Sequence, residues 1–118
     1  MLPRPTPNGL MPPSESTMAK YGLSFASWWA LAERQGFVCA ICKKLPSSCR
    51  LNIDHVHVNG WAKMDPGARA LWVRGLLCYW DNSHTCGRGV TLFRAENMVA
   101  YLKQPLPFNV ATNTREEA

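Results

Sequence analysis

Apolar residues recur at helical spacing in two stretches of the chain. The first follows Ser24, a residue type that caps helix N-termini, and continues to Gly36 with aromatic side chains along one face. The second runs from Thr91 to Lys103 and stops before Pro105, where a helix cannot continue. The pattern predicts a helix in each stretch, and we expect the aromatic stripe of the first to lie in the core.

Two shorter stretches are typical of strands. Residues 51–55 (LNIDH) alternate briefly between apolar and polar, and residues 71–77 (LWVRGLL) are mostly apolar, with Gly75 permitting a bend or a bulge. Between them, residues 59–70 contain Asn-Gly and Asp-Pro-Gly and are expected to form a loop. A short helix is predicted to begin at Asp81 and to break near Gly87-Arg88-Gly89.

The two ends of the chain differ in composition from the middle. Residues 1–18 hold five of the nine prolines and cannot bury enough apolar surface to fold alone, so we expect a flexible arm. Residues 106–118 are predicted to be a polar tail. The predicted organisation is therefore one folded domain over residues 19–105.

Composition narrows the class of protein. With 118 residues, 47% of them hydrophobic, the chain suits one small globular domain. It shows neither a membrane-spanning run nor a signal-peptide pattern, and five cysteines without an export signal favour thiols or metal ligands in a reducing compartment, so we expect a cytoplasmic protein. A net charge of +5 suits a phosphate-rich partner such as DNA. The basic residues that could face phosphates are Lys43, Lys44, Arg50, Lys63, Arg69, Arg74 and Arg88, although any single one of them is more often part of a merely soluble surface. Trp61 and Trp72 are expected to pack.

Three cysteines have the spacing of zinc ligands. Cys39 and Cys42 are separated by two residues, so a tight turn can point both sulfurs at one ion, and Cys78 follows after 35 further residues. If the second pair keeps the two-residue spacing, its partner is Asp81, whose carboxylate is a less common zinc ligand. We expect these four residues to hold a structural Zn²⁺.

Two other residues compete with Asp81 for the fourth position. His84 has a ligating nitrogen, and the thiolate of Cys86 is the better ligand chemically. An unbroken helix would place Cys86 about 12 Å from Cys78, because each residue rises about 1.5 Å, so spacing favours Asp81. Cys49 is expected to be a free thiol.

A second set of polar residues suits phosphodiester hydrolysis. That reaction needs a water nucleophile, a base to deprotonate it and positive charge at the phosphate. His55 suits the base, because the unperturbed pKa of histidine lies near working pH. Asp54 and Asn82 offer hard oxygen ligands for Mg²⁺ or Mn²⁺. Taken singly, each residue is more often a turn, a cap or a locally bonded side chain, so their order along the chain carries the argument.

The order of these motifs resembles the recombination endonuclease VII family, found widely in phages. The resemblance covers roughly residues 20–104. The stretches that carry it are Tyr21-Gly-Leu-Ser24, Gln35-Gly-Phe-Val-Cys39-Ala-Ile-Cys42, Leu51-Asn-Ile-Asp54-His55-Val-His57, Val73-Arg-Gly-Leu-Leu-Cys78, Asn82, Leu92-Phe93 and Ala100-Tyr101-Leu102.

The resemblance implies an α+β fold of the small ββα-metal (His-Me finger, HNH-like) type, with a pair of zinc knuckles and flanking helices. It implies His55 as general base, Asp54 and Asn82 as ligands of the catalytic ion, and His57 as a contact to the scissile phosphate. Cleavage would leave a 5′-phosphate and a 3′-hydroxyl. A role in DNA recombination, packaging or mobility in a phage-infected cell is expected.

Three departures from the family pattern stand out. Asp81 takes the place of a cysteine, and Thr85 takes the place of an acidic residue of the phage junction resolvase. The chain also ends without the additional C-terminal domain of the larger resolvases. Cutting a four-way junction needs two active sites, so a homodimer is possible.

The sequence thus predicts a metal-dependent DNA endonuclease that nicks DNA or cuts branched DNA, with catalytic Mg²⁺ or Mn²⁺ and structural Zn²⁺. The alternative is a zinc module that binds nucleic acid without cutting it, which the departures at Asp81 and Thr85 favour.

Overall fold

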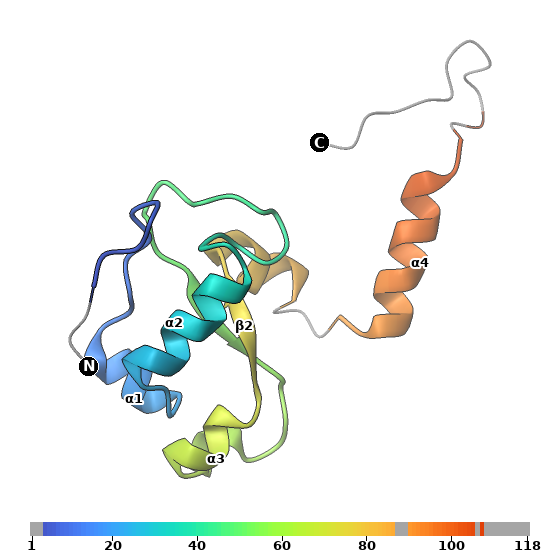
Figure 1. Cartoon of the computed structure of the whole chain (residues 1–118). Coiled ribbons are helices and arrows are strands. Elements are labelled where there is room, and N and C mark those ends of the chain that lie inside the picture. The colour runs from blue at the N-terminus through green and yellow to red at the C-terminus, as the bar shows by residue number, and fades with distance from the viewer. Residues whose placement is uncertain (1–3, 87–89, 106, 108–118) are drawn as a thin grey trace.

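The computed structural model describes residues 4–86, 90–105 and 107. Its architecture is mixed helix and sheet, which agrees with the predicted α+β class (Figure 1). The elements, in chain order, are α1 (Glu15–Lys20), α2 (Phe25–Arg34), β1 (Asn52–His55), the 3₁₀ turn η1 (Trp61–Lys63), α3 (Pro66–Ala70), β2 (Val73–Leu77), the π-helical segment η2 (Asp81–Thr85) and α4 (Leu92–Lys103). None of the helices in the described ranges is long and apolar enough to span a membrane.

Helix α2 begins and packs as its sequence predicts. The hydroxyl of Ser24 accepts a hydrogen bond from the backbone N–H of Ser27 and caps the helix. Trp28 and Ala32, four residues apart on one face, are 1% and 0% exposed. In Figure 1 the helix lies against β2, so its apolar stripe forms one wall of the core.

The two strands form an antiparallel sheet with one irregularity. Ile53 pairs with Leu76 and Asp54 with Gly75, but His55 pairs with Val73, so Arg74 is an extra residue in β2. Ile53 and Leu76 are buried and face the core. The irregularity is a β-bulge beside Gly75, where the sequence permitted one.

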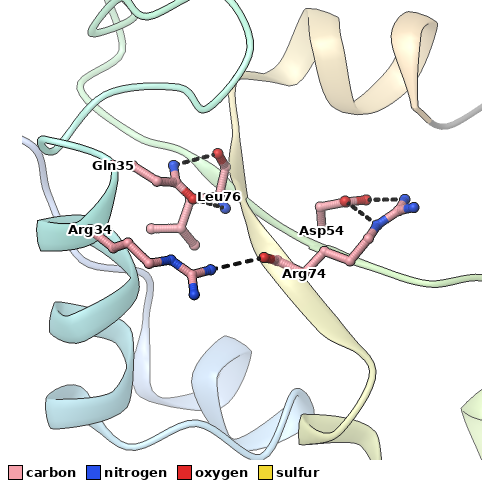
Figure 2. A network of polar contacts seen from close by, with 5 residues as sticks. All are labelled: Arg34, Gln35, Asp54, Arg74 and Leu76. Atoms are coloured by element: carbon pink, nitrogen blue, oxygen red, sulfur yellow. Dashed lines mark hydrogen bonds and ion pairs between the residues drawn. The ribbon is translucent and has the colours of Figure 1, made fainter. Parts of the chain in front are cut away.

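The Gln35 side chain bonds the backbone of β2, and this contact explains why residue 75 is glycine. The Gln35 amide oxygen accepts from the N–H of Leu76 at 2.9 Å, and its NH₂ group donates to the Leu76 carbonyl at 2.8 Å (Figure 2). A β-carbon on Gly75 would lie 2.7 Å from that amide oxygen. Glycine at position 75 therefore leaves room for the Gln35 side chain, which bonds the backbone of Leu76 as a neighbouring strand would.

The segment before α1 is not the free arm that its proline content suggested. Leu10 is 2% exposed and belongs to the core, and the N–H of Met11 donates to the Cys49 carbonyl at 2.7 Å. Arg50 donates to the Pro12 carbonyl at 3.0 Å. These long-range contacts supply the burial that residues 1–18 cannot supply alone, so described residues 4–18 pack on the rest of the chain.

The connection between the strands contains more structure than the loop predicted for residues 59–70. Pro66 occupies the first turn of α3, where its missing N–H has no helical partner to lose. Leu71 and Trp72 follow α3, so β2 begins at Val73, later than predicted. The helix break expected at residues 87–89, and most of the predicted tail, lie outside the described residues.

Helix α4 has the predicted bounds but no buried residue. Thr91 caps it by accepting from the N–H of Arg94 at 3.2 Å. The helix stands apart from the other elements in Figure 1. The apolar residues whose spacing predicted this helix are therefore not buried in the described structure.

Candidate metal centre and active site

Four side chains from two parts of the chain meet beyond the end of β2. The ligand atoms of Cys39, Cys42, Cys78 and Asp81 all lie within 4.8 Å of one another. The sulfurs of Cys39 and Cys78 are each 3.3 Å from Asp81 Oδ2, and the Cys42 and Cys78 sulfurs are 4.0 Å apart. In a tetrahedral site with bonds of about 2.0–2.3 Å, ligand atoms lie roughly 3.3–3.8 Å apart. The cluster therefore has nearly the size of a zinc site.

Local backbone structure aims these side chains. Lys43 adopts a left-handed conformation (φ 62°) that turns the chain just after Cys42. The N–H of Ile41 donates to the Cys39 sulfur at 3.4 Å, and the N–H of Asp81 donates to the Cys78 sulfur at the same distance. Backbone donors thus point at one sulfur in each half of the cluster and help to fix the positions of those sulfurs.

Asp81 is anchored from the side opposite the thiols. The Thr85 hydroxyl donates to Asp81 Oδ1 at 2.8 Å, which leaves Oδ2 toward the sulfurs. Burial alone would raise the pKa of Asp81, but hydrogen bonds from Thr85 and the thiols lower it overall. Burial raises the pKa of the neighbouring Cys78 thiol to about 12. Binding of a metal at this cluster must therefore release the proton of the Cys78 thiol.

The other two candidates for the fourth ligand lie outside this cluster. The His84 ring stacks on Trp80 with centroids 4.9 Å apart, and its Nδ1 lies 3.1 Å from the Trp80 carbonyl. Cys86 packs at the edge of the core, and its thiol interacts electrostatically with Asp54 as well as Asp81. Among the described residues, Asp81 is the one that completes a four-residue set with the three cysteines.

The end of β1 holds the residues predicted for catalysis. Asp54 is 5% exposed, and its two oxygens accept from Nε and Nη2 of Arg74 at 2.8 and 3.3 Å (Figure 2). The bulge at Arg74 makes this contact possible. Sequence reasoning placed Arg74 among residues facing phosphates and missed its pairing with Asp54, although the adjacent Gly75 hinted at an irregular strand.

His55 lies in a group of aromatic rings. Its ring stacks on Trp61 with centroids 4.0 Å apart and planes 17° apart, while His57 and Tyr21 lie at 5.2 and 5.8 Å. Burial, followed by the nearby charge of His57, lowers the pKa of His55 below 6.5. His55 is therefore mainly neutral at physiological pH. Trp61 packs, as expected, but its partner is the candidate base.

Arg69 contacts the Trp61 ring and bonds the backbone around it. Its guanidinium lies 5.1 Å from the ring centroid and donates to the carbonyls of Lys20, Trp61 and Ala62 at 2.9, 3.3 and 2.7 Å. These bonds tie the end of α1 to η1. Arg69, one of the residues that could have faced phosphates, is instead engaged within the protein.

Asn82 borders a pocket next to β1. The pocket has a volume of about 460 Å³ and is also lined by Asn52 and Tyr21. Asn52 and Asp54 share a face of the strand because side chains alternate. Tyr21 in turn contacts His55. Asn82 therefore shares a pocket with a residue that contacts His55, but neither His55 nor Asp54 lines that pocket. In the described part of the chain no hydrogen bond joins Asn82 to Asp54.

Comparison with known proteins agrees with these features. A family profile described as recombination endonuclease VII matches residues 14–104. The Gene 59 protein of Mycobacterium phage D29 is 31% identical over 90 residues, which cover 75% of this chain and 48% of that protein. The Gene 59 protein of Mycobacterium phage L5 is 35% identical over 71 residues, which cover 59% of this chain and 37% of that protein. The chain therefore spans about half the length, or less, of these relatives.

No solved structure matches the chain. The family profile nevertheless extends from the start of α1 to the end of α4, and so includes both the cysteine cluster and the end of β1. This coverage is enough to assign the family: the chain belongs to the recombination endonuclease VII family.

Proposed function

We propose that this chain is a metal-dependent endonuclease that hydrolyses phosphodiester bonds, by nicking DNA or by cutting branched DNA. Membership of the family implies a nuclease with DNA as its substrate and suggests a part in phage recombination. The observation that carries the finer proposal is the end of β1. There a carboxylate and a neutral histidine follow one another beside a pocket bordered by an asparagine.

His55 is the proposed general base. A base must be neutral before it can take a proton from water, and the lowered pKa of His55 keeps it neutral near pH 7. Its stacking on Trp61 fixes the plane of the imidazole and leaves fewer orientations to select during the reaction. His57 is exposed and near His55, where it can contact the scissile phosphate.

Asp54 and Asn82 are the proposed ligands of the catalytic ion. Carboxylate and amide oxygens suit Mg²⁺ or Mn²⁺, and within the described residues no hydrogen bond engages the Asn82 side chain. When bound, the ion would supply positive charge at the phosphate and the leaving oxygen. Convergence of Asp54 and Asn82 on one ion remains a prediction.

The order of the elements supports the proposed ββα-metal arrangement. Strands β1 and β2 precede the helical segment η2, in the chain order that a His-Me finger requires. The proposed structural Zn²⁺, held by Cys39, Cys42, Cys78 and Asp81, would join the turn after α2 to the start of η2. Since η2 carries Asn82, this zinc site would fix one side of the active site. The homodimer and the cytoplasmic location stay predictions.

The second candidate function is a zinc module that binds nucleic acid without cutting it. The observation that favours it is the Arg74 side chain, which engages both oxygens of Asp54. A carboxylate held in this way permanently would not bind a catalytic ion. Both candidates predict DNA binding, so cleavage is the property that separates them.

A plasmid-nicking assay tests the proposal. The parent protein is expected to convert supercoiled plasmid to open circles with Mg²⁺ or Mn²⁺, and His55→Ala is expected to lose this activity while it retains DNA binding. His84→Ala is the matched control, because His84 is exposed and lies outside the site. A parent that stays inactive with both ions on plasmid and on four-way junctions would support the non-cutting module.

A further inference from the structure

Arg74 reaches Asp54 because β2 is irregular. In a regular strand, Arg74 would share a face with Leu76, which is 0% exposed and packs in the core. The bulge removes Arg74 from that alternation, since Asp54 pairs with Gly75 and His55 with Val73. Bulges commonly redirect a side chain next to active sites. Here the redirected side chain ends on the carboxylate proposed as an ion ligand.

The contact engages the whole carboxylate. Nε of Arg74 lies 2.8 Å from one oxygen of Asp54, and Nη2 lies 3.3 Å from the other (Figure 2). Asp54 is buried, whereas the Arg74 side chain is 42% exposed. A divalent cation would need lone pairs of the same oxygens and would repel the guanidinium at close range. The Asp54 carboxylate can therefore bind either the guanidinium or the divalent cation, but not both at once.

The Arg74 side chain can move without the strand. The Arg74 carbonyl accepts from Nη2 of Arg34 at 3.4 Å, and the next residues of β2 are fixed by Gln35 (Figure 2). The guanidinium has its one ion pair, with Asp54, among the described residues. Its paired N–H donors match a phosphate as well as a carboxylate.

We propose that Arg74 and the divalent ion compete for Asp54. When the ion binds, the Arg74 guanidinium leaves Asp54 and binds a phosphate of the bound DNA instead. The inference rests on the proposed function, because it takes Asp54 as an ion ligand. It explains how a site whose buried carboxylate is paired with an arginine can still be catalytic. It also makes ion binding and DNA binding support each other, since the ion frees a phosphate-binding group.

The first test measures binding of Mn²⁺ to the zinc-loaded full chain without DNA, by the loss of the free-ion EPR signal. Arg74→Gln removes the competitor, and Arg74→Lys keeps its charge but not its paired donors. Both are expected to bind Mn²⁺ more tightly than the parent, by about fivefold, which corresponds to a partly exposed ion pair of about 1 kcal/mol. Arg94→Gln, an exposed charge on α4, is the control and should bind as the parent does.

Two results would overturn the inference. If both Arg74 variants bind Mn²⁺ as the parent does, there is no competition. If only Arg74→Gln binds more tightly, the effect is one of net charge rather than of shared oxygens. Asp54→Asn separates this failure from that of the proposed function: undiminished Mn²⁺ binding by that variant would refute Asp54 as a ligand and both proposals with it.

The second test follows the transferred guanidinium. DNA binding by the parent is measured with and without Ca²⁺, and the ion is expected to raise the affinity for DNA. Arg74→Gln should lose most of this increase, and Arg74→Lys should keep part of it. A full increase in Arg74→Gln would show that the guanidinium does not move to a phosphate. Thermal unfolding of each variant checks that the fold is intact.

Discussion

Asp81 and Thr85, two departures from the family pattern, are bonded to each other. The Thr85 hydroxyl donates to one oxygen of Asp81 while the other oxygen faces the thiols. A carboxylate in place of a thiolate has a free second oxygen, and Thr85 supplies a donor for it. Spacing predicted Asp81 as a zinc ligand, whereas Thr85 was interpreted only as the loss of an acidic residue. A hydrogen bond across one helical turn cannot be predicted from either residue alone.

This pairing predicts that Thr85 tunes zinc binding. Thr85→Val should weaken Zn²⁺ binding by about 10- to 100-fold, as is typical when a group that orients a ligand is removed. Competition with a chromophoric chelator measures the affinity, and Ser83→Ala on the same segment is the control. Equal affinities of Thr85→Val and the parent would show that Asp81 needs no such support.

The lowered pKa of His55 predicts the acid limb of the pH–rate profile. Because the general base must be neutral, activity should persist below pH 6.5 and fall only as pH drops through the lowered pKa. Trp61→Ala removes part of the burial that is the main cause of the shift, so its acid limb should move upward toward 6.5. Trp72→Ala, which lacks contact with His55 in the described structure, should keep the parent profile. An acid limb at or above 6.5 in the parent would contradict this account.

At the scale of elements, the end of α2 and strand β2 form one unit. Gln35 bonds both the N–H and the carbonyl of Leu76 and also donates to the Val38 carbonyl at 3.0 Å. These bonds hold the strand that carries Arg74 and leads to Cys78. Helical spacing predicted the helix, but nothing in the pattern showed that the residue at its C-cap would act as a strand partner.

Gln35→Leu should therefore destabilise the fold by about 1–3 kcal/mol, because it leaves buried backbone groups of β2 without partners. The free energy of unfolding in urea measures the loss. Glu33→Gln, an exposed change two residues away, is expected to have little effect. A Gln35→Leu protein as stable as the parent would mean that water replaces the amide.

Local signals explain which elements the sequence predicted. Ser24 and Thr91 act as caps, as expected, and alternation placed β1 within one residue of its bounds. The turns between the strands were missed because Pro66 is read as a breaker yet is tolerated in a first helical turn. The packing of Leu10 was missed because it depends on contacts with distant residues rather than on its neighbours.

At the scale of the whole molecule, the cysteine cluster joins segments that are far apart in sequence. It connects the turn after α2 with the residues that follow β2, and so encloses both strands. Cys-x-x-Cys spacing made this cluster predictable, because two ligands in one turn restrict where the others can be. The site at β1 was less predictable, since the Arg74 contact depends on a bulge whose position alternation does not define.

Removal of the zinc should therefore destabilise the whole fold. A metal present at about 100 times its dissociation constant stabilises by about 2.7 kcal/mol, which for a domain of this size corresponds to a drop in Tm on the order of 10 °C when it is chelated. Differential scanning calorimetry with and without a strong chelator measures the change. Cys39→Ser should start from the lower value and respond little, whereas an unchanged Tm in the parent would refute a structural metal.

The central claim is that Asp54, His55 and Asn82 surround one divalent ion, and anomalous diffraction from crystals soaked in Mn²⁺ tests it most directly. We predict a manganese peak about 2.0–2.2 Å from an oxygen of Asp54 and from the Asn82 amide oxygen, with Arg74 turned away from the carboxylate. A peak elsewhere, with Arg74 still bonded to Asp54 at saturating Mn²⁺, would contradict the account.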